Sequence, residues 1–294
     1  MGFLVAQFLS GLANASSLFL VAAGLSIIFG VTRIVNFAHG SFYMLGAFVA
    51  YSLAERMSGA IGFWAAVAGA ALCAGVLGVI VEVLLLRRLY RSPELFQLLA
   101  TFGLVLVVQD LALTVWGPED LLGPRAPGLE GVVRILGRPF PQYDLLLIAL
   151  GPAVLGLLWL LFHRTRWGIL VRAATEDREM TGALGVKQTR LFTSVLFLGT
   201  ALAGLAGALQ VPREAANLQM DINIVVEAFV VVVIGGMGSV AGAFLASLLI
   251  GQLQAFGILV FPQVTLVLVF LVMALVLVVR PYGLLGRPQA VPRA

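Results

Sequence analysis

The chain has 294 residues, of which 61% are hydrophobic and only 11% carry a charge. Soluble domains contain about 25% charged residues, which cover their surface, so this composition excludes a water-soluble enzyme. The mean hydropathy of +1.07 and several uncharged stretches near the roughly 20 residues that cross a bilayer as a helix indicate a polytopic membrane protein. The net charge of +4 is basic, but in so apolar a chain such an excess more often sets the orientation in the membrane. We therefore expect no nucleic-acid partner.

The chain lacks the residue patterns that disulfide bonding, metal binding, enzymatic catalysis and ATP binding usually require. Cys73 is the single cysteine, so a disulfide framework and a cysteine metal site are impossible. No two of the polar candidates in or beside the apolar stretches have the spacing of a metal site or of a nucleophile and its base, so we expect that the protein is not an enzyme and binds no metal; these candidates are Asn36, His39, Gln109, Asp110, His163 and Glu227. The chain also has no Gly-x-x-x-x-Gly-Lys-Ser/Thr phosphate loop. We expect no cofactor here, and any ATP must be bound by partner subunits.

The expected spans follow one another along the chain. Residues 1–10 have no basic region and no cleavage site, so the apolar run to Phe29 is interpreted as a first span and not as a signal peptide. Further apolar stretches lie at roughly 39–54, 61–86, 95–115, 144–162, 191–211 and 264–279. Ridges of small residues, such as Gly199, Ala203 and Gly207, predict close packing between these helices.

The region 225–256 is predicted to be a broken helical element. Its apolar halves, 225–234 and 240–255, are separated by Gly235, Gly236, Met237, Gly238 and Ser239, which are mostly of poor helix propensity. Irregular backbone at membrane depth is tolerated only where protein buries it or where it lines a wet cavity. Interrupted helices therefore mark substrate paths in transporters. The sequence leaves open whether this element is re-entrant or consists of two short spans.

Charge placement predicts the orientation, because short cytoplasmic loops collect Lys and Arg. The densest basic clusters lie in 164–190 and 87–91, and an even number of spans separates them. The connection 116–142 is then external, and 132–137 within it predicts a small β-hairpin. The N-terminus should be external and the C-terminus, with Arg280, cytoplasmic. Parity then requires 225–256 to enter and leave by the external side.

These observations predict an all-α polytopic integral membrane protein with one transmembrane domain over 1–294. We expect about eight transmembrane helices, including the broken or re-entrant pair, and a short cytoplasmic helix in addition.

The motifs resemble a known family, the permease subunits of bacterial branched-chain amino acid ABC importers. The stretches that carry the resemblance are 28–31 with 35–46 (containing Asn-Phe-Ala-His-Gly), 172–186, 228–239 and 280–286. The chain is most similar to the smaller of two paralogous permeases. The resemblance implies a paralogous permease, two ATP-binding cassette ATPases and a periplasmic binding protein as partners, within the bilayer of the bacterial inner membrane.

The segment 164–190 is then expected to couple the permease to an ATPase. A single helix over 170–183, ended by Gly185, would dock on the ATPase. The alternative is a solvated amphipathic loop without a partner. The candidate coupling residues are Arg172, Glu176, Asp177, Arg178, Glu179 and Gly185.

The candidate residues of the translocation path lie at the interruption 235–239 and at or just after a second possible break, 31–40, between two apolar helices. They are Asn36, His39, Ser41, Tyr43, Gly235, Gly236, Gly238 and Ser239. Asn36 and His39 could equally cap helices and hold the turn. Two carboxylates in apolar stretches could also be functional, but simpler interpretations are available. We expect Asp110 to be solvated at the membrane interface, near the external end of its helix. Glu227 is expected to begin a half-helix, where it would interact favourably with the positive end of the helix dipole.

Alternatives for the function remain open at this point. The resemblance extends to importers of urea, short amides and small carboxylates. A secondary transporter would share broken helices but needs deep ion-binding carboxylates, and a channel needs symmetric rings of polar groups.

Overall fold

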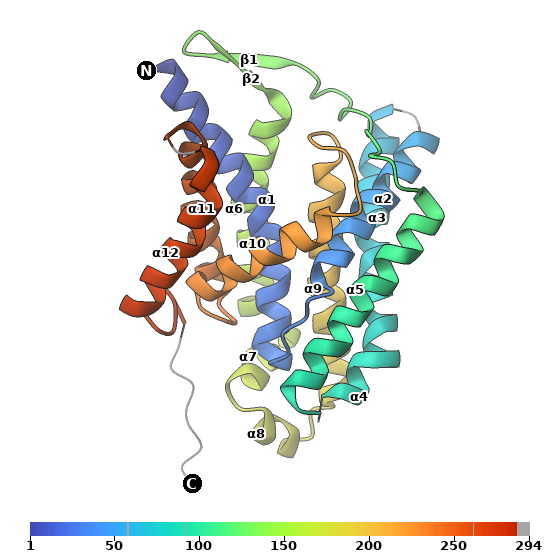
Figure 1. The fold of residues 1–294 in the computed structure, drawn as a ribbon. Coiled ribbons are helices and arrows are strands. Elements are labelled where there is room, and N and C mark those ends of the chain that lie inside the picture. The colour runs from blue at the N-terminus through green and yellow to red at the C-terminus, as the bar shows by residue number, and fades with distance from the viewer. Residues whose placement is uncertain (58, 91, 261, 287–294) are drawn as a thin grey trace.

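The computed structural model describes residues 1–57, 59–90, 92–260 and 262–286 (Figure 1). It is almost entirely α-helical, which confirms the predicted all-α membrane class. Among the described residues, six helical stretches are long and apolar enough to cross a membrane. The remaining helices of the bundle are shorter, with 18 residues in α2, 16 in α10 and 15 in α12.

The elements follow one another in chain order. They are α1 (Gly2–Thr32), α2 (His39–Arg56), α3 (Gly59–Val81), a π-helical segment η1 (Glu82–Leu86), α4 (Arg87–Leu89), α5 (Glu94–Trp116), β1 (Val132–Ile135), β2 (Arg138–Pro141), α6 (Gln142–Arg164), α7 (Arg166–Glu176), α8 (Arg178–Ala183), α9 (Gln188–Gln210), α10 (Met220–Gly235), α11 (Val240–Val260), a 3-10 turn η2 (Pro262–Val264) and α12 (Thr265–Val279).

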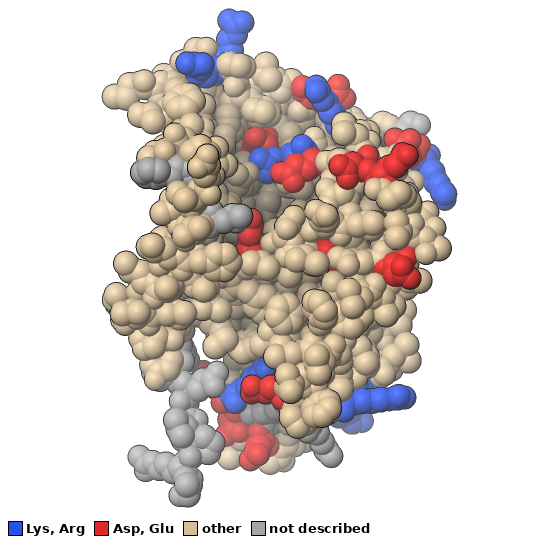
Figure 2. Space-filling model, in the orientation of Figure 1, with Lys and Arg blue, Asp and Glu red and all other residues tan. Residues whose placement is uncertain are grey.

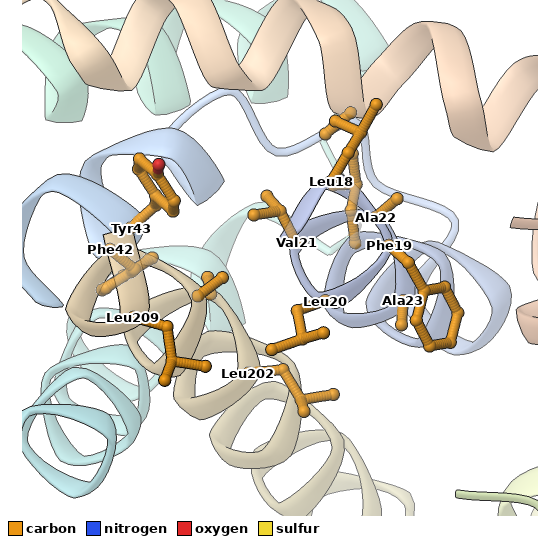
Figure 3. Close-up of a cluster of buried hydrophobic side chains, with 14 of the residues drawn as sticks. Leu18, Phe19, Leu20, Val21, Ala22, Ala23, Phe42, Tyr43, Leu202 and Leu209 are labelled. Atoms are coloured by element: carbon orange, nitrogen blue, oxygen red, sulfur yellow. The ribbon is translucent and has the colours of Figure 1, made fainter. Parts of the chain in front are cut away.

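Two helices form the centre of the bundle. α1 packs against α6, α9, α10 and α11, and α9 packs against α1, α2 and α3. Figure 3 shows side chains of these central helices meeting, among them Leu20 of α1, Phe42 of α2 and Leu202 of α9. The sequence of α1 is apolar on all sides, as expected of a helix that protein surrounds.

Small residues on α9 allow this packing, as the sequence predicts. A Cβ atom on Gly204 would collide with Ala74 of α3, and a Cβ atom on Gly46 of α2 would collide with the backbone of Gly204. Glycine at position 204 therefore lets the three helices approach at backbone distance.

The predicted hairpin is present in the connection before α6. β1 and β2 are antiparallel, with Val132 opposite Pro141. Leu136 and Gly137 have φ values of 48° and 79°. Positive φ at both central residues is the geometry that a two-residue hairpin requires.

The two ends of the bundle differ in their contents. Figure 1 shows the N-terminus and the hairpin at one end, which we call the hairpin end, and α4, α7 and α8 at the other. α10 lies across the bundle instead of along it. Figure 2 shows that on one face charged side chains gather toward the two ends, with a largely uncharged band between them. That distribution is typical of a protein that spans a bilayer.

Candidate functional site

The break between α10 and α11 is built from glycine conformations and a serine cap. α10 ends at Gly235, and Gly236 and Gly238 have φ values of 99° and 85°. Residues other than glycine rarely adopt such φ values. Ser239 Oγ then accepts a hydrogen bond of 3.0 Å from Gly242 N, which caps the first turn of α11. The helical element is longer than the sequence suggests, because it begins at Met220 and continues to Val260.

The carbonyl groups at the end of α10 are capped by the C-terminal turn. Leu284 N donates to Ile234 O at 2.7 Å, and Leu285 N donates to Gly235 O at 3.0 Å. Gly236 lies directly against this turn, so that a Cβ atom on it would collide with Gly286 N. Two motifs that lie about 50 residues apart in the chain therefore form one unit. It satisfies backbone groups that would be unpaired in a membrane.

The loop that leads into α10 and the C-terminal part of α11 both lie at the hairpin end of the bundle, whereas α10 itself begins beside Ser41, near the start of α2. Arg213, which precedes α10, hydrogen-bonds to Asn14 of α1 at 2.8 Å and forms an ion pair of 3.1 Å with Asp144 at the start of α6. At the end of α11, Gln252 Nε2 donates to Phe8 O in the first turns of α1 at 3.0 Å. The break itself lies beside Gly30, near the opposite end of α1. The chain thus runs from the hairpin end to the far end of α1 and back.

Asp221, in the first turn of α10, was missed by the sequence analysis. Its side chain is only 1% exposed. It accepts hydrogen bonds from Gln109 Nε2 of α5 at 2.9 Å, from Ser41 Oγ of α2 at 3.3 Å and from the amide of Ile222 at 2.7 Å. The carboxylate therefore joins three helices. A signal was available, since an acidic residue before an apolar run is typical of a helix start.

The predicted path residues between α1 and α2 are buried. Asn36 Oδ1 accepts from Ala38 N at 3.1 Å, and His39 Nε2 lies 3.0 Å from Val21 O, to which it donates. Asn36 Nδ2 and His39 Nδ1 have no hydrogen-bond partner among the described residues. Tyr43 lies at the edge of the cluster in Figure 3. The contacts of Asn36 and His39 hold the turn, and the path role of this group stays a prediction.

Glu227 does not begin its half-helix, so the expectation for this residue is wrong. α10 begins at Met220, which places Glu227 about two turns into the helix, where the dipole of the first turn no longer acts. Its side chain is half-buried and hydrogen-bonds to Gln254 of α11. Figure 2 shows a recess on the face in view, with acidic and basic side chains inside it. Asp110, by contrast, is exposed on α5.

The expected single helix over 170–183 is two helices. α7 ends at Glu176, and Asp177 is extended, with φ −142°. The Asp177 carboxylate accepts a 2.9 Å hydrogen bond from Met180 N and so caps α8. Aspartate is a favoured N-cap residue, which explains why a new helix starts here.

The other coupling candidates lie on the surface of this segment. Arg172, Glu176 and Glu179 are exposed, and the side chain of Arg178 lies outside the described part of the chain. Gly185 has a φ of 85°, so its turn does require glycine. Trp167 Nε1 donates to Ser194 Oγ at 2.7 Å, which fixes α7 to α9.

No metal site is formed by the parts of the chain that the structure describes. No three His, Cys, Asp or Glu side chains lie close enough together to hold an ion.

Comparison with known proteins identifies the family. The model of the branched-chain amino acid transport system permease component matches residues 7–278. The chain belongs to this permease family. It is 31% identical to the high-affinity branched-chain amino acid permease BraD of Pseudomonas aeruginosa and 28% identical to LivH of Escherichia coli K12, over 96% of both chains in each case. It is 26% identical to LivM of Escherichia coli K12, of which it covers only 72%. This permease therefore has the length of the BraD and LivH type, as its motifs indicate. No solved structure is significantly similar to it.

Proposed function

We propose that this chain is the smaller permease subunit of an ABC importer that moves branched-chain amino acids across the bacterial inner membrane. It pairs with a paralogous permease. Two ATPase subunits bind the ATP, so that this chain takes no cofactor, and a periplasmic binding protein delivers the substrate. The observation that carries the proposal is the family match over nearly the whole chain, together with relatives named for this transport.

The charges at the two ends of the bundle support an orientation for the permease. The end that holds α4, α7 and α8 carries the basic clusters of 87–91 and 164–190, so we assign it to the cytoplasm. The hairpin end, with the N-terminus, then faces the periplasm. The C-terminus is assigned to the cytoplasm, although 287–294 lie outside the described residues.

The translocation path is assigned to the face that α10 crosses. A helix of 16 residues is about 24 Å long, which is shorter than the hydrocarbon core, and an oblique helix covers still less depth. Glu227 brings a carboxylate to membrane depth with an uncharged amide, Gln254, as its hydrogen-bond partner. Carboxylates at such depth usually serve transport. Together with the paralogous subunit, this face would enclose the path, and the segment 236–239 would line its cytoplasmic part.

Energy coupling would run through α7 and α8. ATP binding can alternate access only if closure of the ATPases moves the permease mechanically. α7 is fixed to α9 through Trp167 and lies beside the end of α1, where it approaches the break. A displacement of α7 would therefore reach the path directly.

Reconstitution tests the proposal. Proteoliposomes with both permeases and both ATPases should take up leucine only with ATP on the ATPase side and binding protein on the other. Collapse of the proton gradient should leave uptake unchanged. Uptake that persists without the ATPases and follows the gradient would instead identify a secondary transporter.

The path assignment has its own test. In a Cys73→Ala background, Met237→Cys should react with a water-soluble thiol reagent, and Ile258→Cys, on an exposed part of α11, should react only with a lipid-soluble one. Equal reaction of the two positions with the lipid-soluble reagent alone would exclude the 236–239 segment from the path.

A further inference from the structure

A pocket of about 770 Å³ opens between α4 and the start of α9, at the end of the bundle that holds α7 and α8. Three cationic side chains line it, namely Arg87, Lys187 and Arg190. Thr189 contributes a hydroxyl group to its wall, and Val79 and Phe197 contribute apolar side chains. None of the named path residues or of the six candidate coupling residues lines it, but Lys187, Thr189 and Arg190 belong to the end of the coupling segment 164–190.

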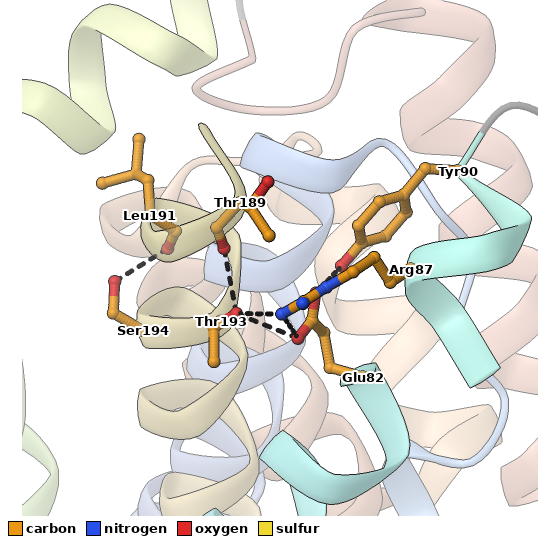
Figure 4. A network of polar contacts seen from close by, with 7 residues as sticks. All are labelled: Glu82, Arg87, Tyr90, Thr189, Leu191, Thr193 and Ser194. Atoms are coloured by element: carbon orange, nitrogen blue, oxygen red, sulfur yellow. Dashed lines mark hydrogen bonds and ion pairs between the residues drawn. The ribbon is translucent and has the colours of Figure 1, made fainter. Parts of the chain in front are cut away.

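One wall of this basic pocket is held rigidly. Glu82 lies in η1 with its side chain fully buried. It accepts hydrogen bonds from Arg87 Nη2 at 2.9 Å and Nε at 3.2 Å, and Tyr90 OH donates to it at 3.2 Å (Figure 4). Arg87 Nη2 also donates to Thr193 Oγ1 at 3.1 Å. The guanidinium group is thereby fixed toward α9, and its side chain remains 39% exposed.

The other two cations have no ion-pair partner in the part of the chain that the structure describes. No carboxylate of the described residues lies within ion-pair distance of Lys187 or Arg190. Lys187 is also the N-cap residue of α9, without a side-chain cap, so the positive end of a 23-residue helix adds to their field. After Glu82 has balanced Arg87, the pocket keeps an excess of two positive charges.

The apolar wall continues toward the membrane. Val79 of α3 lies in the pocket, and its neighbours Val76 and Ile80 are 52% and 45% exposed. A ligand that fills this pocket would therefore meet cations at one end and an exposed hydrocarbon surface at the other. A soluble anion would use only the first of these.

We propose that this pocket binds the phosphate headgroup of an anionic phospholipid of the cytoplasmic leaflet, with the acyl chains along α3. The charge, the helix end and the adjoining apolar surface match such a lipid. The inference rests on the proposed orientation of the permease. Because Lys187 and Arg190 lie at the end of the coupling segment 164–190, the lipid would anchor the end of that segment to the membrane surface.

Lipid retention by the detergent-solubilised importer complex tests this inference without any measurement of transport. Native mass spectrometry would compare added phosphatidylglycerol with phosphatidylcholine on the wild type and on Lys187→Gln/Arg190→Gln. Two cations near a membrane surface account for about 30-fold in affinity for an anionic lipid. The wild type should therefore prefer phosphatidylglycerol, and the double variant should lose about that factor. Arg164→Gln/Arg166→Gln removes two exposed charges at the same end of the bundle and should retain the lipid.

Every other outcome overturns the inference. Equal retention of both lipids by the wild type, or unchanged retention by Lys187→Gln/Arg190→Gln, would exclude the site. An equal loss in the control variant would show a general charge effect. Full displacement by inorganic phosphate would identify a small-anion site, and retention seen only after removal of the ATPases would assign the pocket to the ATPase interface. Normal ATP-driven uptake by the wild-type complex would keep the proposed function intact in all these cases.

Discussion

Gly30 of α1 and Gly238 in the α10–α11 break lie so close that a Cβ atom on Gly30 would be 3.0 Å from the Cα atom of Gly238. The same Cβ atom would lie 3.7 Å from Cγ2 of Thr175 on α7. Three elements thus meet at one glycine: the central helix, the break and the coupling segment. A bulky side chain at this position would separate them.

Substitutions at Gly30 should therefore affect transport in proportion to their size. Gly30→Ala requires a shift of a few tenths of an ångström and should keep most of the uptake. Gly30→Val should lower ATP-driven uptake by about tenfold, a typical effect of a coupling position. Gly156→Val is the control, because nothing lies within 4 Å of a Cβ atom there. Equal uptake by Gly30→Val and the control would show that this junction does not transmit motion.

Asp221→Ala should destabilise the permease, because it removes the acceptor of Ser41 Oγ and leaves Gln109 Nε2 with only its longer hydrogen bond of 3.4 Å to Leu218 O. Each unpaired buried donor costs about 1–3 kcal/mol. A lower midpoint of thermal unfolding is expected for the purified complex. Asp110→Ala removes an exposed carboxylate beside Gln109 and should change the midpoint little. The effects of Asp221→Ala and Gln109→Leu should be non-additive, and strict additivity would refute the contact.

At the junction of α7 and α8, two effects of the acidic residues can be tested separately: the helix cap that Asp177 forms and the negative charge of Glu176 and Asp177. Asp177→Asn keeps an N-cap residue and should retain ATPase activity stimulated by the loaded binding protein. Asp177→Lys with Glu176→Lys removes the cap, worth about 1 kcal/mol, and reverses both charges. This double variant should insert normally but lose stimulated ATPase activity and uptake together. Wild-type values for both would rule out this junction as the coupling element.

Glu82→Gln should loosen the end of α3. It removes the ion pair with Arg87, whose side chain is half-exposed, so the loss of stability should be smaller than the loss on breaking a fully buried pair. The measurement is again thermal unfolding of the complex. Glu55→Gln, at an exposed position of α2, is the matched control. An unchanged midpoint for Glu82→Gln would mean that the network in Figure 4 adds nothing to stability.

Features that depend on neighbouring residues could be predicted from the sequence. Apolar runs gave the spans, and the residues around Leu136 and Gly137 gave the hairpin. The glycines after Ile234 gave the position of the break, because few other residues accept its backbone angles. The break between α7 and α8 at Asp177 could also have been predicted, because aspartate is a favoured N-cap residue. The sequence on both sides of Asp177 favours a helix, however, and so led to the prediction of a single helix.

Contacts between distant segments could not be predicted in this way. Nothing in 234–239 indicates that residues 284 and 285 supply its hydrogen bonds. Likewise, the structural role of Asp221 depends on its hydrogen bonds with Gln109 and Ser41, which lie on two other helices. One sequence contains periodicity and local preferences, but it does not state which helices are neighbours.

The cap on α10 also imposes an order on the folding of the protein during its synthesis. The amides of Leu284 and Leu285, which pair with Ile234 and Gly235, are synthesised only after α11 and α12. Until then the end of α10 has carbonyl groups without these partners in a nonpolar medium, which is unfavourable. α10 and α11 can therefore reach their final arrangement only after α12 has been inserted. A nascent chain that stops at Gly283 would contain all the helices that the structure describes and still lack these two hydrogen bonds.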